Sequence, residues 1–284
     1  MAYSGTHNDL LDAVAAEPGI ASSLRQVDSQ SGGAVLLGDA AEQAWPFLAA
    51  VLARALGKGH RVWFVCRDVK SQEEFASELS SWIPQATLFP DLEIPAAGLG
   101  LPDPEPAAER LAVLGRIARD EIVAPVVTSS QWQELVPTVQ DLTGGLLSLP
   151  RGWKGSPGAV VTRLTEAGYE WVAQVIRRGE FALRGGILDL FSWQRSMPCR
   201  LEFDEEGIAS IREFDLDTQT SVGEVEVCEI QTGDTDKASL PLHGYVGPED
   251  LVVEVGWEAS PEQSPLSELP RCRRVVVSSA PLPE

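Results

Sequence analysis

A short apolar segment that ends in a glycine is the first place where this chain could bind a phosphate. Residues 34–37, Ala-Val-Leu-Leu, precede Gly38, and a helical pattern begins near Trp45. A strand, a loop and a helix in this order can hold phosphates, and the motif G-x-x-x-x-G-K-[ST] adds a lysine and a hydroxyl. Counted from Gly38, the second glycine falls on Gln43, the lysine on Ala44 and the hydroxyl on Trp45. Because neither Ala44 nor Trp45 supplies the required group, we predict a degenerate nucleotide site.

Acidic side chains make the same loop less favourable for a nucleotide. Asp39 and Glu42 lie within it and would repel a triphosphate. On the late apolar segment 251–255, Glu254 is the one acidic residue, and we expect it at a solvated edge. We therefore predict that the chain hydrolyses no ATP and needs no cofactor. The alternative is an ATPase with an atypical phosphate loop.

Histidines and cysteines are too scattered to suggest a metal site or a catalytic group. They are His7, His60, His243, Cys66, Cys199, Cys228 and Cys272. The cysteines form no C-x-x-C pair, and the histidines have no spacing that suits a metal or a catalytic triad. Asp189, within the apolar segment 187–191, is expected to be a buried structural carboxylate, since no second carboxylate is placed to pair with it. We predict no metal site and no catalytic residue.

Arginines gather in a stretch whose side chains alternate as they do in strands. They are Arg177, Arg178, Arg184 and Arg200. Alternation places Glu180, Ala182 and Arg184 on one face of a strand and Phe181 and Leu183 on the other. One face would pack on a helix at residues 162–168, and the other would show Arg184 beside its neighbouring arginines.

Two interpretations of these arginines follow from spacing alone. Arginine pairs with carboxylates through two hydrogen bonds and is enriched at binding hot spots, so the surface could dock a protein. Alternatively, Arg184 and Arg200 pair across strands with Glu180 and Glu202, which stabilises a sheet by a few tenths to about 1 kcal/mol. Gly185-Gly186 is expected to form a bulge or a close approach of backbones.

The elements before this stretch alternate between helices and strands. Residues 10–28 are expected to form a helix followed by a polar segment. Further helices are expected at 45–56, 71–82 and 105–119, and strands at 34–38, 61–66, 86–89 and 121–127. Ser71 is the expected N-cap of the helix at 71–82. This alternation predicts an α/β domain with a mostly parallel sheet.

The pattern changes after about residue 140. A short helix at 162–168 and strands at 169–177, 180–191, 199–203 and 208–214 predict a small α+β domain with an antiparallel sheet. Later strands at 225–230, 251–255 and 274–277 could complete the parallel sheet. We therefore predict an α/β domain in two parts, residues 1–140 and 223–284, with an inserted α+β domain at 141–222.

The charge of the chain argues against direct binding to nucleic acid. The formal net charge is −20, and residues 141–222 carry nine basic and 12 acidic side chains, so the excess lies mainly in the flanks. Acidic flanks would repel phosphates, although the excess acid could also serve only solubility. The sequence has no apolar run long enough for a membrane span and no signal-peptide pattern, which predicts a cytoplasmic protein with no membrane partner.

Several blocks of the sequence resemble the UvrB-homology region of bacterial transcription-repair coupling factors (Mfd). The blocks are Glu166-Ala-Gly-Tyr169, Gln174-Val, Gly179-Glu-Phe-Ala-Leu-Arg-Gly-Gly-Ile-Leu-Asp-Leu-Phe191, Pro198, Arg200-Leu-Glu-Phe203 and residues 208–221. The sequence of UvrB resembles the same blocks more loosely. The resemblance implies a helicase-like, degenerate P-loop NTPase domain that has lost its nucleotide site and is split by an inserted domain that binds UvrA.

The resemblance also implies which residues would contact UvrA. Arg184 matches the arginine that contributes to this contact in these families, and Phe181, Arg178 and Arg200 are weaker candidates nearby. This chain departs from the pattern of these families at one position. After Gly168-Tyr169 the families commonly place an arginine that contacts UvrA, whereas this chain has Glu170, which reverses the charge.

The residues and the resemblance together predict a non-catalytic adaptor of nucleotide excision repair that recruits UvrA in transcription-coupled repair. The alternatives are a UvrB-like ATPase, a direct DNA binder and a stand-alone regulatory scaffold. RNA polymerase and DNA would be contacted only through other parts of a larger protein. The sequence is compatible both with a part of such a protein and with a stand-alone module.

Overall fold

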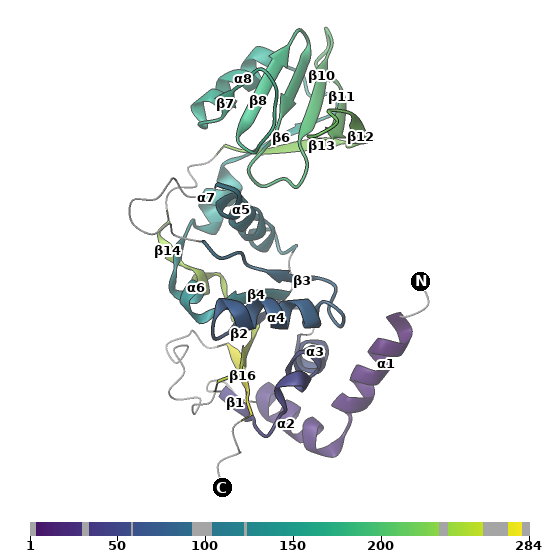
Figure 1. The fold of residues 1–284 in the computed structure, drawn as a ribbon, viewed down its shortest axis with the longest axis vertical. Coiled ribbons are helices and arrows are strands. Elements are labelled where there is room, and N and C mark those ends of the chain that lie inside the picture. The colour runs from purple at the N-terminus through teal and green to yellow at the C-terminus, as the bar shows by residue number, and fades with distance from the viewer. Residues whose placement is uncertain are drawn as a thin grey trace. The chain divides into compact units, whose positions relative to one another are not determined.

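The computed structural model describes residues 4–29, 34–57, 59–92, 104–121, 124–232, 238–257 and 272–279. The chain divides into two compact units (Figure 1). The parallel-sheet unit comprises Met1–Asp91, Asp120–Val136 and Leu240–Glu284, and the antiparallel-sheet unit comprises Leu92–Arg119 and Pro137–Ser239. The predicted α/β class with a parallel sheet and a separate antiparallel sheet is confirmed. The predicted domain limits after residues 140 and 222 stay a prediction.

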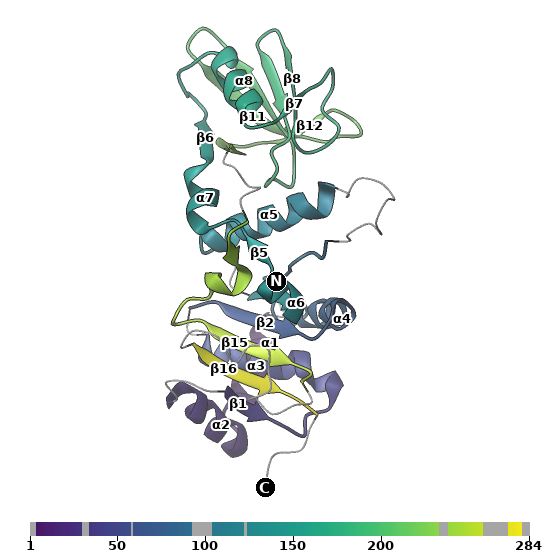
Figure 2. The same cartoon turned by 90° about the vertical axis from the view of Figure 1, so that its left-hand side faces the viewer.

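A six-stranded sheet forms the centre of the parallel-sheet unit (Figure 2). The strands are β1 (Ala34–Leu37), β2 (Val62–Cys66), β3 (Ala86–Leu88), β4 (Ala124–Thr128), β15 (Leu251–Val255) and β16 (Arg273–Val277), with β5 (Leu135–Val136) and β14 (Leu240–Pro241) as a separate antiparallel pair. The six-stranded sheet has the order β1-β16-β15-β2-β4-β3, and all its pairings are parallel. Strands covered by helices on both sides must be apolar throughout, which explains the continuous hydrophobic runs.

Helices of this unit supply apolar side chains to one core shared with the sheet. They are α1 (Ser4–Ala15), α2 (Pro18–Ser29), α3 (Trp45–Leu56) and α4 (Val69–Leu79). The unit also contains the short helix α6 (Ser129–Gln133) and the 3₁₀ turns η1 (Glu42–Ala44) and η2 (Leu242–Tyr245). The single helix expected at 10–28 is two helices, because Pro18 begins a new one in the position where its missing N–H costs nothing. The N-cap of α4 is Asp68 and not the expected Ser71. The Asp68 carboxylate accepts a hydrogen bond from the Ser71 backbone N–H at 2.9 Å.

Glu254 is buried in the middle of this sheet, and the expectation of a solvated edge was wrong. Its strand β15 lies between β16 and β2, and the residue is 0% exposed. The Arg274 guanidinium on β16 donates to Glu254 Oε1 from Nε at 3.1 Å and from Nη2 at 2.5 Å. A buried carboxylate is tolerated only when such a partner is present, because desolvation of an unpaired charge is costly.

This ion pair leads to a stability prediction. We expect Arg274→Met to lower the free energy of unfolding of the parallel-sheet unit by about 3–5 kcal/mol, because Glu254 would remain buried without its main cation. The double variant Arg274→Met/Glu254→Met should be more stable than the single one, since no charge is then left behind. Urea unfolding followed by tryptophan fluorescence measures both values. A single variant as stable as the double would mean that the pair does not compensate Glu254.

Antiparallel strands, two of them joined by a tight hairpin, form the second unit. The strands are β6 (Leu146–Pro150), β7 (Glu170–Trp171), β8 (Glu180–Arg184), β9 (Ile187–Leu190), β10 (Cys199–Phe203), β11 (Ile208–Phe214), β12 (Ser221–Glu224) and β13 (Val227–Gln231), and the helices are α5 (Pro104–Ala118), α7 (Val139–Gly144) and α8 (Pro157–Glu166). Six strands form a sheet of order β12-β11-β10-β9-β8-β7, in which only the short β7 runs parallel to its neighbour. Among the helices that the structure describes, none is long and apolar enough to cross a membrane.

One face of this sheet is closed by α8. Val160 and Leu164 of the helix belong to the same buried cluster as Phe181, Leu188 and Leu201 of the strands. The expected packing of a helix against one face is therefore confirmed. The helix begins at Pro157 rather than near residue 162, because Ser156 caps it and Pro157 occupies its first turn.

Other details of this antiparallel sheet differ from what the sequence predicted. The strand expected at 169–177 is only two residues long. Gly185-Gly186 is not a bulge but the two-residue turn between β8 and β9, and Gly185 has the positive φ of 61° that such a turn requires. The expected close approach of backbones is confirmed at Gly186, where a Cβ would lie 2.9 Å from the Phe203 carbonyl oxygen. Residues 227–231 pair with β6 instead of completing the parallel sheet, which only β15 and β16 join.

Candidate functional site

The sheet face opposite α8 carries polar side chains in rows across the strands. Residues directly opposite each other in an antiparallel pair point to the same side. Arg184 lies opposite Ile187, Ile187 opposite Glu202, and Glu202 opposite Ser210. A second row runs from Asp189 through Arg200 to Arg212. We call this side of the sheet the open face.

Arg184 is the cation on the open face whose charge is most available to a partner. It is exposed and lies directly before the Gly185-Gly186 turn. Its Nη2 donates to the carbonyl oxygen of Ala173, which fixes the side chain without neutralising it. Among the residues that the structure describes, no carboxylate forms an ion pair with Arg184. The exposed Ile187 beside it adds apolar area, a combination that suits protein docking.

Arg200, by contrast, is held inside the sheet. Its Nε and Nη2 donate to the two oxygens of Asp189 at 2.7 and 2.9 Å, and its guanidinium lies 4.8 Å from the centre of the Phe214 ring. The hydrogen bonds to Asp189 raise the pKa of Arg200. Asp189 is the buried, hydrogen-bonded carboxylate that the sequence suggested. The cross-strand partner of Arg200 is thus Asp189 rather than Glu202, which instead accepts from Arg212 and Ser210.

Arg178 and Arg177 lie at the other end of β8 and differ in availability. Arg178 is half-buried, donates from Nε to the Arg195 carbonyl at 3.0 Å and stacks 5.0 Å from the centre of the Phe191 ring. Burial lowers the pKa of Arg178. Arg177 is exposed but bonds both Glu170 and Glu180, each at 2.9 Å. These two hydrogen bonds raise the pKa of Arg177.

The remaining two predicted contact residues have opposite environments. Glu170 is exposed on β7, and Arg177 neutralises it. Phe181 is 0% exposed and belongs to the core under α8, so its side chain is not part of the surface. The structure therefore brings Glu170, Arg177 and Arg178 together around a hollow of about 230 Å³ and places Arg184 and Arg200 on the open face.

Sequence reasoning missed two exposed apolar side chains in this region. Trp171 is 60% exposed and Ile176 is 64% exposed. The expectation of a strand through 169–177 did not include the exposed loop that follows Trp171. The signal that could have found them is the sequence Val-Ala-Gln-Val at 172–175, where a small and a polar residue interrupt the hydrophobic pattern.

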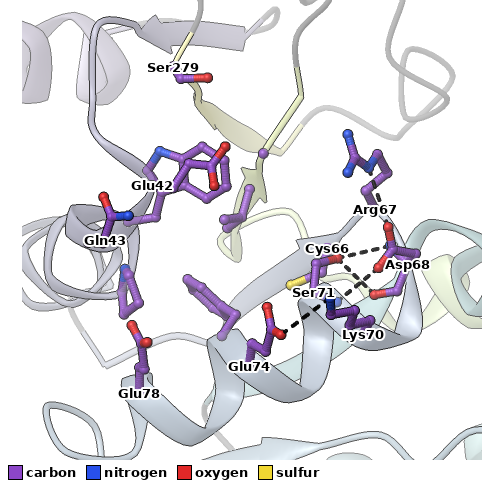
Figure 3. A pocket seen from close by; sticks show the side chains of 15 residues that line it. Glu42, Gln43, Cys66, Arg67, Asp68, Lys70, Ser71, Glu74, Glu78 and Ser279 are labelled. Atoms are coloured by element: carbon purple, nitrogen blue, oxygen red, sulfur yellow. Dashed lines mark hydrogen bonds and ion pairs between the residues drawn. The ribbon is translucent and has the colours of Figure 1, made fainter.

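The loop for which a degenerate nucleotide site was predicted borders a pocket at the carboxyl end of the parallel sheet (Figure 3). A pocket of about 380 Å³ is lined there by Gln43 and Trp45 together with residues that follow β2 and β15. The Trp45 indole donates to the Ala40 carbonyl at 3.1 Å and packs against Gly256. Gly38 and Ala44 lie in the same loop, at the end of β1 and in η1.

Acidic side chains outnumber basic ones around this pocket (Figure 3). Arg67 and Lys70 are each next to an acid, at 3.4 Å from Asp68 and 3.9 Å from Glu74. Glu42 and Glu78 also line the pocket, and no cation among the described residues forms an ion pair with either. Phosphate sites depend on lysine, backbone N–H groups and Mg²⁺, so this lining opposes a triphosphate.

Part of the antiparallel-sheet unit is similar to a known protein family. Residues 147–234 match the family model described as the UvrB interaction domain. The match runs from β6 to just beyond β13 and so contains the open face, the β7–β8 loop and α8.

Longer alignments relate the chain to particular proteins. It is 31% identical over 202 residues to the transcription-repair-coupling factor of Escherichia coli, an alignment that covers 68% of this chain and 17% of that protein. It is 36% identical over 172 residues to that of Haemophilus influenzae and 28% over 166 residues to that of Bacillus subtilis, covering 60% and 57% of this chain and 14% of each relative. The chain thus spans about a sixth of the length of the curated relatives that it matches. The resemblance to these coupling factors is confirmed.

The lining of the pocket leads to a binding prediction. We expect millimolar Mg-ATP to leave the thermal unfolding midpoint of the chain unchanged, because the acidic excess at Glu42 and Glu78 repels phosphates. A ligand present at about 100 times its Kd would add about 2.7 kcal/mol of stability and would be seen easily. Differential scanning calorimetry with and without Mg-ATP measures the shift, and Mg-sulfate is the control. A clear rise with Mg-ATP alone would revive the ATPase alternative.

Proposed function

We propose that this chain is an adaptor that recruits UvrA in transcription-coupled nucleotide excision repair and takes no part in catalysis itself. The observation that carries the proposal is Arg184. It is an exposed cation without an ion-pair partner among the described residues, and it lies beside exposed Ile187 on a rigid sheet. Rigid placement lowers the entropic cost of binding, and arginine with apolar neighbours is typical of binding hot spots.

The family match supports this assignment. The antiparallel-sheet unit is similar to a domain described by its interaction in the UvrB system, and the relatives are described as coupling transcription and repair. An interaction domain needs a surface rather than a reaction centre. The open face provides such a surface, with Arg184 available, Arg200 and Arg212 paired, and Asp189 buried beneath.

We further infer that the parallel-sheet unit is a helicase-like scaffold whose nucleotide site is degenerate. Its support is the strand order of the sheet, the pocket at its carboxyl edge and the acidic lining of that pocket. Ligands of open parallel sheets bind at this edge, so a changed lining there changes what the fold can bind. In a longer protein, such a scaffold would hold the adaptor while other parts contact RNA polymerase and DNA, in the cytoplasm.

The central test is the charge of Arg184. We expect Arg184→Glu to weaken UvrA binding at least about 100-fold, because removing a hot-spot cation and adding a like charge opposite acidic groups costs more than 2 kcal/mol. Isothermal titration calorimetry of the chain with UvrA measures the Kd.

The matched control for this test is Arg163→Glu, which changes the charge of an exposed arginine in the last turn of α8, away from the open face. It should leave the Kd within about twofold of the unchanged chain, whereas Arg184→Glu should not. Equal binding by the chain and by a folded Arg184→Glu variant would contradict the proposed docking surface.

A further inference from the structure

The loop between β7 and β8, residues 172–179, packs on part of the open face. Val175 in this loop is 1% exposed and forms a small apolar cluster with Ala182 and Phe214 of the sheet. Because side chains alternate along β8, Ala182 lies on the same side of the sheet as Arg184. The loop therefore covers one part of the open face, and Arg184 remains exposed beside it.

Backbone carbonyl groups of this loop accept hydrogen bonds from two side chains of the sheet and its turns. The Arg184 guanidinium donates from Nη2 to the Ala173 carbonyl. Two residues further on, the Val175 carbonyl accepts from Gln219 Nε2 at 3.2 Å. The same short piece of backbone thus contacts both the cation of the proposed docking surface and Gln219.

Gln219 lies in the turn between β11 and β12 and has an unusual backbone conformation. Its φ is +57°, in the left-handed region that residues other than glycine rarely adopt. Asp215 holds the turn, because its carbonyl accepts from the Gln219 N–H and its carboxylate accepts from the Thr218 N–H, both at 2.8 Å. Strained conformations of this kind persist where the surrounding contacts compensate for them, and they occur often at functional sites.

Hydrogen bonds of Gln219 connect the loop, the turn and the rigid part of the open face. Besides the Val175 carbonyl, Gln219 Nε2 donates to the Leu216 carbonyl at 2.8 Å, so both N–H groups of the amide are used. The Gln219 carbonyl accepts from Arg200 Nη1 at 3.4 Å. Because Asp189 already holds Arg200, Gln219 attaches the loop to a fixed point of the sheet.

We propose that Gln219 is a positioning residue for UvrA docking: it holds the β7–β8 loop on the open face, and the loop in turn holds the Arg184 guanidinium in the orientation that UvrA binds. This inference rests on the proposed function. Ordering a free arginine side chain on binding costs conformational entropy, so an arginine that is already oriented gives a tighter complex. Arg200 contributes to docking through its hydrogen bond to Gln219.

Calorimetric titration of UvrA with the full chain and its Gln219 variants tests this role. Gln219→Gly removes the side chain but suits the positive φ, so the turn itself is not strained. It should weaken binding about fivefold or more, because Arg184 loses its fixed orientation. Gln219→Glu has nearly the same shape but presents oxygen instead of N–H to two carbonyl groups, and it should weaken binding at least as much.

The matched control is Asp217→Ala, which changes an exposed side chain of the same turn. It should leave the Kd within about twofold of the unchanged chain. Gln219→Gly and Gln219→Glu variants that both bind as tightly as this control would overturn the positioning role.

A double-mutant cycle shows whether Gln219 acts through Arg184. In a chain that carries Arg184→Ala, Gln219→Gly should weaken UvrA binding less than about twofold, because the side chain that it positions is already absent. A general loss of structure would weaken binding by the same factor in both backgrounds, and that result would overturn the proposal. In the free chain, nitrogen-15 relaxation should show a more mobile Arg184 Nε in Gln219→Gly, with Arg200 Nε unchanged. An equally rigid Arg184 would also overturn it.

The outcomes separate this inference from the proposed function. If the unchanged chain binds UvrA and Arg184→Glu weakens binding while both Gln219 variants bind as before, the positioning role is overturned and the adaptor function stands. If the unchanged chain gives no binding heat at two temperatures and no co-elution with UvrA, the adaptor function is overturned and the positioning role with it. Weaker binding by Gln219→Gly that disappears in the Arg184→Ala background supports both.

Discussion

Burial of one sheet face under α8 is the constraint on which the docking surface depends. Side chains alternate along β8, so fixing Phe181 and Leu183 against the helix fixes Ala182 and Arg184 on the other side. A slip of one residue would bury Arg184 and expose Phe181, at the cost of a large apolar side chain in water and an unpaired charge in the core. The side of the sheet on which Arg184 lies is thus set by the core, and its hydrogen bond to the Ala173 carbonyl fixes only the end of the side chain.

Arg184 and Arg200 have different roles, and their spacing in the sequence could not distinguish them. Arg184 and Arg200 both point to the open face, but Asp189 lies directly opposite Arg200 and captures its guanidinium. Arg184 lies opposite Ile187, which offers no acceptor, so its charge remains available. Cross-strand register decides which of two similar arginines is structural. Register depends on the turn at Gly185-Gly186, which was expected as a bulge or a close approach of backbones and not as a turn.

Regular, strongly patterned elements were predictable, and short or tertiary features were not. The helix from Trp45 and the strand at 62–66 follow from apolar periodicity, since nothing competes with burial there. Glu254 was misplaced because its partner Arg274 is 20 residues away and only the parallel register brings them together. The loop between β7 and β8 was misassigned as a strand for a related reason. Its conformation depends on the buried Glu180, and no local pattern shows that a carboxylate in a strand will turn back to bind a preceding loop.

Glu170 shows how a reversed charge can be compatible with docking. Read by position alone, an acid in place of an arginine would repel an acidic partner. In the structure its carboxylate bonds Arg177, whose guanidinium also bonds the buried Glu180, so the charge is compensated within the loop. Exposed pairs of this kind contribute little stability, and their main effect is to restrain geometry. The reversed charge is therefore compensated within the loop, and Arg184 still supplies the cation of the proposed docking surface.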